Sequence, residues 1–250
     1  MKKYLKTELL PLIVLAAGIF GLLLKLWQSI AGTDEGGLLL RGHISGILLV
    51  ILSVTVLVLT GAGVFSLKEG TSYRRNFPAS LTSCIGAGAA AIGIAVTAVN
   101  YLSRPKDLLS LVAGVLAVLA ALCLLFLSYC RFRGQQPNLL FHICVCIFLM
   151  LHLICQYRVF SNEPQVQTYC YPLLATVCIM LSCYQSASFA GNYGNRGAHA
   201  FFHLSAVYFC CLCLVDSHAP FFYLTTGTWM LTDLCNLRPM SRRISRGSSL

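Results

Sequence analysis

The residues best suited to chemistry are three histidines and an aspartate that lie in or beside long apolar segments. His199 and His203 are four residues apart, so both imidazoles project from the same face of a helix. His142 begins another apolar segment, and Asp233 lies near the end of the last one. Imidazole nitrogens and carboxylate oxygens bind Zn²⁺ and similar divalent ions. These four residues are therefore the candidate metal ligands, and a divalent metal is the one cofactor that the sequence suggests.

A simpler interpretation of the same residues needs no metal. A pair of histidines four residues apart is common, and each can serve as a hydrogen-bonding group at the membrane interface. The expected connectivity returns Asp233 to the depth of His199 and His203, because 203–216 and 219–233 each rise by about 20 Å at 1.5 Å per residue. Depth does not determine which way the side chains face. Asp233 is expected to reach water from the end of its helix.

A second group of polar residues suggests a ligand site or a polar cavity. His152 and Gln156 are four residues apart within one segment, and hydrogen bonds to a neighbouring helix explain them adequately. Arg196 lies in the Gly/Asn-rich link 190–197, before a helix start whose backbone N–H groups can hold an anion. Glycine and asparagine are also ordinary turn formers, which is the simpler interpretation of this link. The candidate ligand residues are His152, Gln156, Tyr184, Gln185 and Arg196.

These residues must be positioned by helices that cross a membrane. Hydrophobic residues make up 57% of the chain and charged residues 10%, whereas about 25% of a soluble domain is charged. Eight segments approach the roughly 20 apolar residues that cross the hydrocarbon core as a helix, and an open strand cannot satisfy its backbone in lipid. The sequence therefore predicts an all-α polytopic membrane bundle of eight transmembrane helices. The segments are Leu9–Trp27, Ile44–Phe65, Ala79–Tyr101, Leu108–Tyr129, Leu139–Tyr157, Tyr169–Phe189, Ala198–Val215 and Pro220–Leu237.

The distribution of lysine and arginine predicts the orientation of these helices. Thirteen of the 18 Lys and Arg residues lie at the N-terminus, in alternate links and in the tail, whereas the remaining links hold four. Cytoplasmic links carry the excess of positive charge, so both termini are expected in the cytoplasm and the number of crossings is even. The last segment is the least apolar, because threonines and Asp233 interrupt it. Omitting it would place the arginine-rich tail outside the cell, so we retain it.

The chain is expected to form one membrane domain, 1–250, whose two halves differ in character. The first half is rich in Ala, Gly, Leu and Val and suits a packing scaffold, whereas cysteine, histidine and aromatic residues gather in the second. The basic tail is expected to contact anionic lipid. The parts are 1–135 for helices one to four, 136–237 for helices five to eight and 238–250 for the tail. Polar substitutions are expected to block close helix approach at Gly86, Gly88 and Gly93.

The first segment has some features of a secretory signal. Lysines precede its apolar run, and Ser29-Ile30-Ala31 is a formal small-x-small cleavage sequence. Lys25 within the run and the seven further segments favour an uncleaved first helix. Lys25 lies near the end of its segment, so its ammonium group is expected to extend to the membrane interface.

Composition and motifs narrow the function without defining a reaction. The net charge of +10 lies mainly in links between apolar segments, where it marks topology and argues against nucleic-acid binding. No His-Glu-x-x-His or Gly-x-Ser-x-Gly motif occurs. Many ion-coupled carriers have a carboxylate near the centre of a membrane segment, and this sequence has none there. We expect a non-enzymatic accessory or sensor protein in a bacterial plasma membrane, with the lipid bilayer as its partner and protein partners undefined. The alternatives are a small-ligand transporter and a metal-dependent membrane-embedded enzyme.

Overall fold

Helices account for all the regular structure that the computed structural model describes. The described residues are 2–32, 43–64, 70–103, 105, 107–160, 166–216 and 219–237. The helices are α1 (Lys2–Ala31), α2 (Ile44–Val64), α3 (Tyr73–Asn76), α4 (Leu81–Ser103), α5 (Leu108–Arg133), α6 (Leu139–Phe160), α7 (Val166–Ala190), α8 (Arg196–Asp216) and α9 (Pro220–Cys235). A helix satisfies its own backbone where water is absent, which explains this architecture in so apolar a chain. The predicted all-α fold class is confirmed.

Seven helices, namely α1, α2 and α4 to α8, are long and apolar enough to cross a membrane, and they define a multi-pass membrane protein. The eighth predicted segment forms α9, which has only 16 residues. Its length of about 24 Å, at 1.5 Å per residue, falls short of the roughly 30 Å hydrocarbon core. The count of eight crossings and the orientation of the termini therefore stay predictions. The basic tail 238–250 lies outside the described residues.

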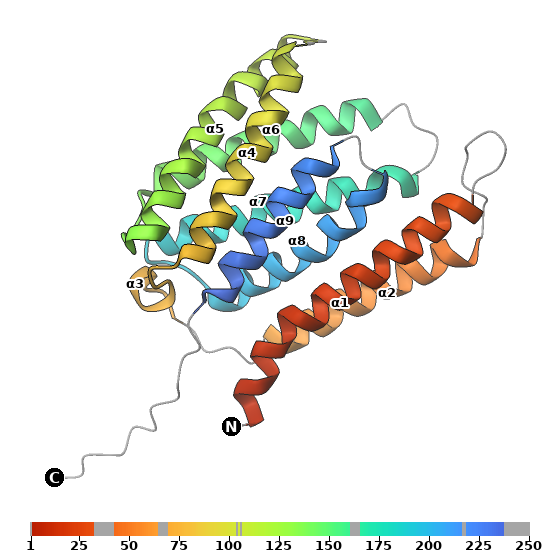
Figure 1. Cartoon of the computed structure of the whole chain (residues 1–250), viewed down its shortest axis with the longest axis horizontal. Coiled ribbons are helices and arrows are strands. Elements are labelled where there is room, and N and C mark those ends of the chain that lie inside the picture. Colours follow the sequence, from red (N-terminus) through yellow and green to blue (C-terminus); the bar gives the residue numbers. More distant parts are fainter. Residues whose placement is uncertain are drawn as a thin grey trace.

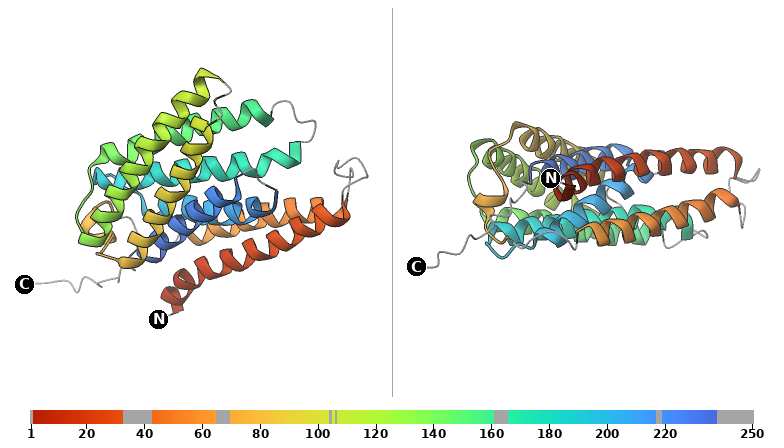
Figure 2. Two further views of the ribbon diagram at one scale, coloured as in Figure 1. Left: turned by 45° about the horizontal axis from the view of Figure 1, so that its top comes forward. Right: turned by 90° about the horizontal axis from the view of Figure 1, so that it is seen from below.

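The long helices are arranged so that α8 and α9 lie in the interior of the bundle (Figure 1). Helix α9 packs mainly against α4 and α8, and α8 also contacts α1, α2 and α7. The antiparallel pairs α4–α5 and α1–α2 lie on different sides of this interior, as the two further views in Figure 2 also show. The start of α1, the short helix α3 and the end of α9 lie toward the same end of the bundle, which we call the α3 end.

Small residues allow α4 to approach α9 closely. A Cβ atom added at Gly86 would overlap Thr232 of α9, and one added at Gly93 would overlap Thr225. Both threonine hydroxyls donate hydrogen bonds to the backbone of α9, so neither side chain can rotate away without losing a bond. Gly88 differs, because an added Cβ would meet only Ser128 Oγ at an ordinary 3.7 Å. Packing thus supports the predictions for Gly86 and Gly93. At Gly88 the structure has space for an added Cβ atom.

We expect Gly93→Ala to destabilise the fold by about 1–3 kcal/mol, the usual effect of overpacking. Gly88→Ala is the matched control, because it adds the same methyl group to the same helix where there is space. Its stability should stay unchanged or rise slightly, since alanine favours the helix. Unfolding of both variants in detergent measures the difference. Equal stability of the two proteins would contradict the close α4–α9 contact.

The link between α7 and α8 is held by its own asparagines. The Asn195 side chain accepts hydrogen bonds from the backbone N–H groups of Gly197 and Ala198 and thereby caps the start of α8. Asn192 adopts a left-handed φ of 62°, which asparagine tolerates, and its Oδ1 accepts the backbone N–H of Tyr73. These polar groups therefore hold α3 against the start of α8.

The sequence predicts that the ammonium group of Lys25 extends to the membrane interface, but the structure encloses this side chain within the bundle. Its side chain is 2% exposed, and its Nζ lies 4.9 Å from the centroid of the Tyr171 ring. Helix α1 packs against α8, so the stem of Lys25 is covered by protein. The prediction failed because hydropathy gives the depth of a lysine but not the side of the helix on which it lies.

Candidate metal centre

Asp233 forms the middle of a buried polar cluster at the α3 end. Its side chain is 1% exposed although it lies only two residues before the end of α9. Ser83 of α4 donates a hydrogen bond of 2.8 Å to Oδ1, and Nη2 of Arg131 lies 2.9 Å from Oδ1 and 3.0 Å from Oδ2. The expectation that Asp233 reaches water is wrong, because side chains from α4 and α5 enclose the end of α9.

Arg131 supplies the positive charge of this cluster, whereas its place in the sequence predicts only a marker of the cytoplasmic side. Its position on α5 continues a buried face that includes Leu124 and Leu127 at helical spacing, and this spacing is the signal that could have placed it inside. The guanidinium carbon lies 4.1 Å from the centroid of the Phe77 ring and 5.1 Å from that of Tyr73, within cation–π range. Burial raises the pKa of Tyr73 to about 12, so a neutral phenol covers the guanidinium.

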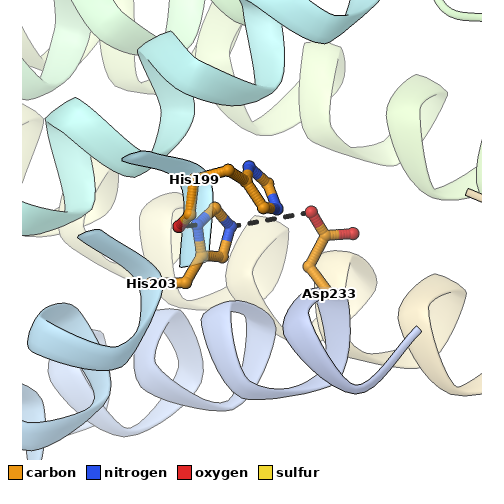
Figure 3. A group of neighbouring side chains, drawn as sticks. All are labelled: His199, His203 and Asp233. Carbon is orange, nitrogen blue, oxygen red and sulfur yellow. Dashed lines mark hydrogen bonds and ion pairs between the residues drawn. The ribbon is translucent and has the colours of Figure 1, made fainter. Parts of the chain in front are cut away.

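His203 presents one ring nitrogen to the carboxylate of Asp233. Its Nδ1 lies 2.8 Å from the carbonyl oxygen of His199, and because a carbonyl can only accept, Nδ1 carries the proton. Its Nε2 lies 3.7 Å from Asp233 Oδ2 (Figure 3). In the neutral imidazole Nε2 carries a lone pair, so two electron-rich atoms face each other in a buried site. A cation between them, either a proton or a metal ion, would relieve this arrangement.

His199 lies beside His203 on the same face of α8, as the spacing predicts. The two ring centroids are 3.8 Å apart, and the rings of Phe77 and Phe189 meet His199 edge-on at 5.3 Å each. Among the described residues, neither nitrogen of this fully buried imidazole has a hydrogen-bond partner. A buried unpaired nitrogen is unfavourable and needs a physical explanation. A bound cation is one such explanation.

Donor atoms of His199, His203 and Asp233 all lie within 4.8 Å of one another. Two donor atoms of a tetrahedral zinc ion lie about 3.4 Å apart, given bonds of about 2.0–2.2 Å. The 3.7 Å separation between His203 and Asp233 is close to this value. The 4.8 Å limit of the whole group is longer by roughly 1.4 Å, so an imidazole must move for all three residues to bind one ion. The three residues therefore suit a divalent ion with two nitrogen ligands and one oxygen ligand.

The fourth predicted ligand, His142, is buried but lies outside this group. Helix α6, which carries it, packs mainly against α5 and α7, and Gln156 farther along α6 contacts α9. Cys183 of α7 donates its thiol hydrogen to the carbonyl oxygen of His142 over 3.5 Å, and its Sγ lies 4.0 Å from Nδ1. The structure thus brings three of the four predicted ligands together.

The predicted ligand residues His152 and Gln156 belong to a separate hydrogen-bonded network. His152 Nδ1 lies 2.9 Å from the Tyr101 hydroxyl, and its Nε2 lies 3.0 Å from Gln156 Nε2. Gln156 also donates a hydrogen bond of 2.8 Å to the hydroxyl of Tyr223 and accepts one of 2.9 Å from Thr176. These bonds join α4, α6, α7 and α9, so the interpretation as interhelical hydrogen bonding fits this pair.

The remaining three predicted ligand residues lie apart from that network. Tyr184 is 59% exposed on the outer face of α7, and Gln185 is partly buried beside it. Arg196 is buried at the start of α8. The five residues therefore do not line one common cavity.

Comparison with known proteins adds no family to this geometry. No protein-family model, curated protein or solved structure matches the chain.

Proposed function

We propose that this protein is a non-enzymatic membrane sensor that binds a divalent transition-metal ion through His199, His203 and Asp233. Eight helices cross the plasma membrane in this account, with α9 as the last and both termini in the cytoplasm. The metal centre then lies near the cytoplasmic boundary. We take Zn²⁺ as the ion for the proposed experiments, because it binds imidazole and carboxylate ligands in the same site.

The single observation that carries the proposal is the pairing of His203 Nε2 with Asp233 Oδ2 at 3.7 Å inside the protein. Both side chains are almost completely buried, and Nδ1 of His203 is bonded to the His199 carbonyl, so Nε2 is the ring nitrogen that faces the carboxylate. A metal ion converts this unfavourable pair into two ligands. His199 adds a third donor from the adjacent turn of the same helix.

His203 and Asp233 make hydrogen bonds to neighbouring groups of the kind that usually orient metal ligands. Metal-binding imidazoles commonly donate their second N–H to a carbonyl, which fixes the tautomer, and His203 does so. Ligating carboxylates are also hydrogen-bonded, and Ser83 performs this role at Oδ1 of Asp233. Oδ2 faces His203 Nε2 at 3.7 Å and also accepts a hydrogen bond of 3.0 Å from Nη2 of Arg131.

Burial favours a sensor over an enzyme. A catalytic metal keeps a position open for water or substrate, whereas His199, His203 and Asp233 are at most 1% exposed. The ligands come from α8 and α9, so an ion bound to both helices would stabilise one arrangement of the bundle by binding the native state. The transporter alternative has less support, because its expected lining residues are not gathered together.

The direct test is equilibrium dialysis of the purified protein in detergent against Zn²⁺. We expect about one tightly held ion per chain, together with a rise in melting temperature that a chelator reverses. Mg²⁺ at the same concentration is the control, and it should have little effect because it prefers oxygen ligands. If the protein takes up no zinc above the level of a denatured sample, the proposal is wrong.

The proposed orientation has its own test. The segment 70–80 should lie in the cytoplasm, because α3 carries Arg74 and Arg75 at the positively charged end. A single cysteine at Thr71, introduced into a cysteine-free protein, should resist an impermeant thiol reagent in intact cells and react after permeabilisation. A probe at Gly37 should behave in the opposite way. Reversed labelling of the two probes would invert the topology.

A further inference from the structure

We infer that Arg131 is an internal competitor of the metal, so that metal binding releases its guanidinium from Asp233 and opens the α3 segment that covers it. This inference rests on the proposed metal centre and adds its regulation. The two cations share one carboxylate, and the described structure has Arg131 in contact with both oxygens.

The contact between Arg131 and Asp233 is incomplete for an arginine. A strong arginine–carboxylate pair uses two parallel N–H···O bonds from two nitrogens. Here Nη2 alone approaches both oxygens, whereas Nη1 is buried with no hydrogen-bond partner among the described residues. The guanidinium therefore neutralises Asp233 without using its full bonding capacity. A better ligand for the carboxylate can displace it.

Charge balance gives the direction of the exchange. The charges of Arg131 and Asp233 sum to zero, so this ion pair is balanced without a metal. Adding a dication next to the buried guanidinium would place like charges together in a medium of low dielectric constant, which is unfavourable. Moving Arg131 away from the carboxylate reduces this repulsion. The metal and the guanidinium therefore oppose each other at Asp233.

The α3 segment, residues 70–77, connects this exchange to the α3 end of the bundle. Phe77 contacts the guanidinium of Arg131 on one side and the ring of His199 on another. The segment is held by a hydrogen bond from the Tyr73 N–H to Asn192 and one from the Phe77 N–H to the Tyr73 carbonyl. When Arg131 leaves Asp233, its aromatic cover must move, and these two hydrogen bonds are weakened.

Two measurements on the full-length protein test the inference. In the wild type, saturating Zn²⁺ should accelerate hydrogen exchange at the amides of Tyr73 and Phe77. Exchange around His152, in the separate network, should stay unchanged. In Arg131→Gln the zinc affinity should rise by about five- to 150-fold, the range of a typical coupling between two sites. Arg131→Lys retains the charge without the planar guanidinium, and its affinity should lie between the two.

The affinity of Arg131→Gln decides between competition and simple support. An arginine that only orients Asp233 would make zinc binding about 10–100-fold weaker when removed. Lower or equal affinity in Arg131→Gln would therefore overturn the inference while leaving the metal centre intact. Unchanged exchange at Tyr73 and Phe77 in zinc-bound wild type would also overturn it, even if the variants fail to fold. If neither wild type nor Arg131→Gln binds zinc, the proposed function itself fails and the competition fails with it.

Discussion

Asp233→Asn is expected to lower the free energy of unfolding by about 3–5 kcal/mol, the usual effect of removing one partner of a buried ion pair. The substitution keeps the shape of the side chain but leaves the guanidinium of Arg131 in a nearly dry interior without its counter-charge. Arg131→Met should have a similar effect, because it leaves a buried carboxylate uncompensated. Denaturant titration in detergent measures both changes.

The double variant Arg131→Met/Asp233→Asn separates this mechanism from general packing damage. With both charges removed, the loss should be smaller than the sum of the single losses by about 0.5–3 kcal/mol. Arg158→Met is the exposed control, because Arg158 and Asp107 form a 2.8 Å ion pair whose side chains are 55% and 53% exposed. That change should cost about 1 kcal/mol or less. Additive losses at Arg131 and Asp233 would mean that the pair is not coupled.

The second large effect concerns metal affinity. His203→Ala and His199→Ala should each weaken zinc binding by at least about 100-fold, more than the roughly 10–100-fold typical of an outer-shell partner. His152→Ala is the matched control, because it removes an equally buried imidazole from the separate network. Isothermal titration of the folded variants with Zn²⁺ gives the affinities. If His152→Ala and His203→Ala lose affinity equally, zinc is not held by the proposed centre.

His142→Ala distinguishes three ligands from four. His142 is buried, but the structure leaves it outside the group formed by His199, His203 and Asp233. We therefore expect its removal to weaken zinc binding less than tenfold, below the roughly 10–100-fold typical of an outer-shell partner. The same titration measures this change. A loss as large as that of His203→Ala would restore His142 to the ligand set.

The depth of the centre could be predicted from the sequence, because it depends on chain length alone. The short link between α8 and α9 forces the two helices to run back along each other, and this returns Asp233 to the level of His199 and His203. Which sides of the helices face each other depends on packing between segments distant in the sequence. For this reason the exclusion of His142 and the exposure of Tyr184 were not predictable.

The charged partner of Asp233 was missed for a related reason. Arginine near a helix end ordinarily marks the cytoplasmic side of a membrane helix, and Arg131 fits that rule by position. Arg131 differs from Arg133 in that it lies four residues after Leu127, on the buried face of α5. Arg133 is exposed. Lys25 shows the same limit, since hydropathy gave its depth but not its burial beside Tyr171. Composition and hydropathy therefore do not show whether a charged residue near a helix end is buried, because burial depends on the direction of its side chain.

X-ray absorption at the zinc edge of protein loaded with one equivalent tests the central claim most directly. The proposed centre predicts only nitrogen and oxygen neighbours at about 2.0–2.2 Å, with the outer-shell signal of imidazole. Loss of part of that imidazole signal should accompany His203→Ala. Sulfur neighbours at about 2.3 Å would instead assign the ion to cysteine thiolates. That result, or the spectrum of hydrated zinc, would contradict a metal centre formed by His199, His203 and Asp233.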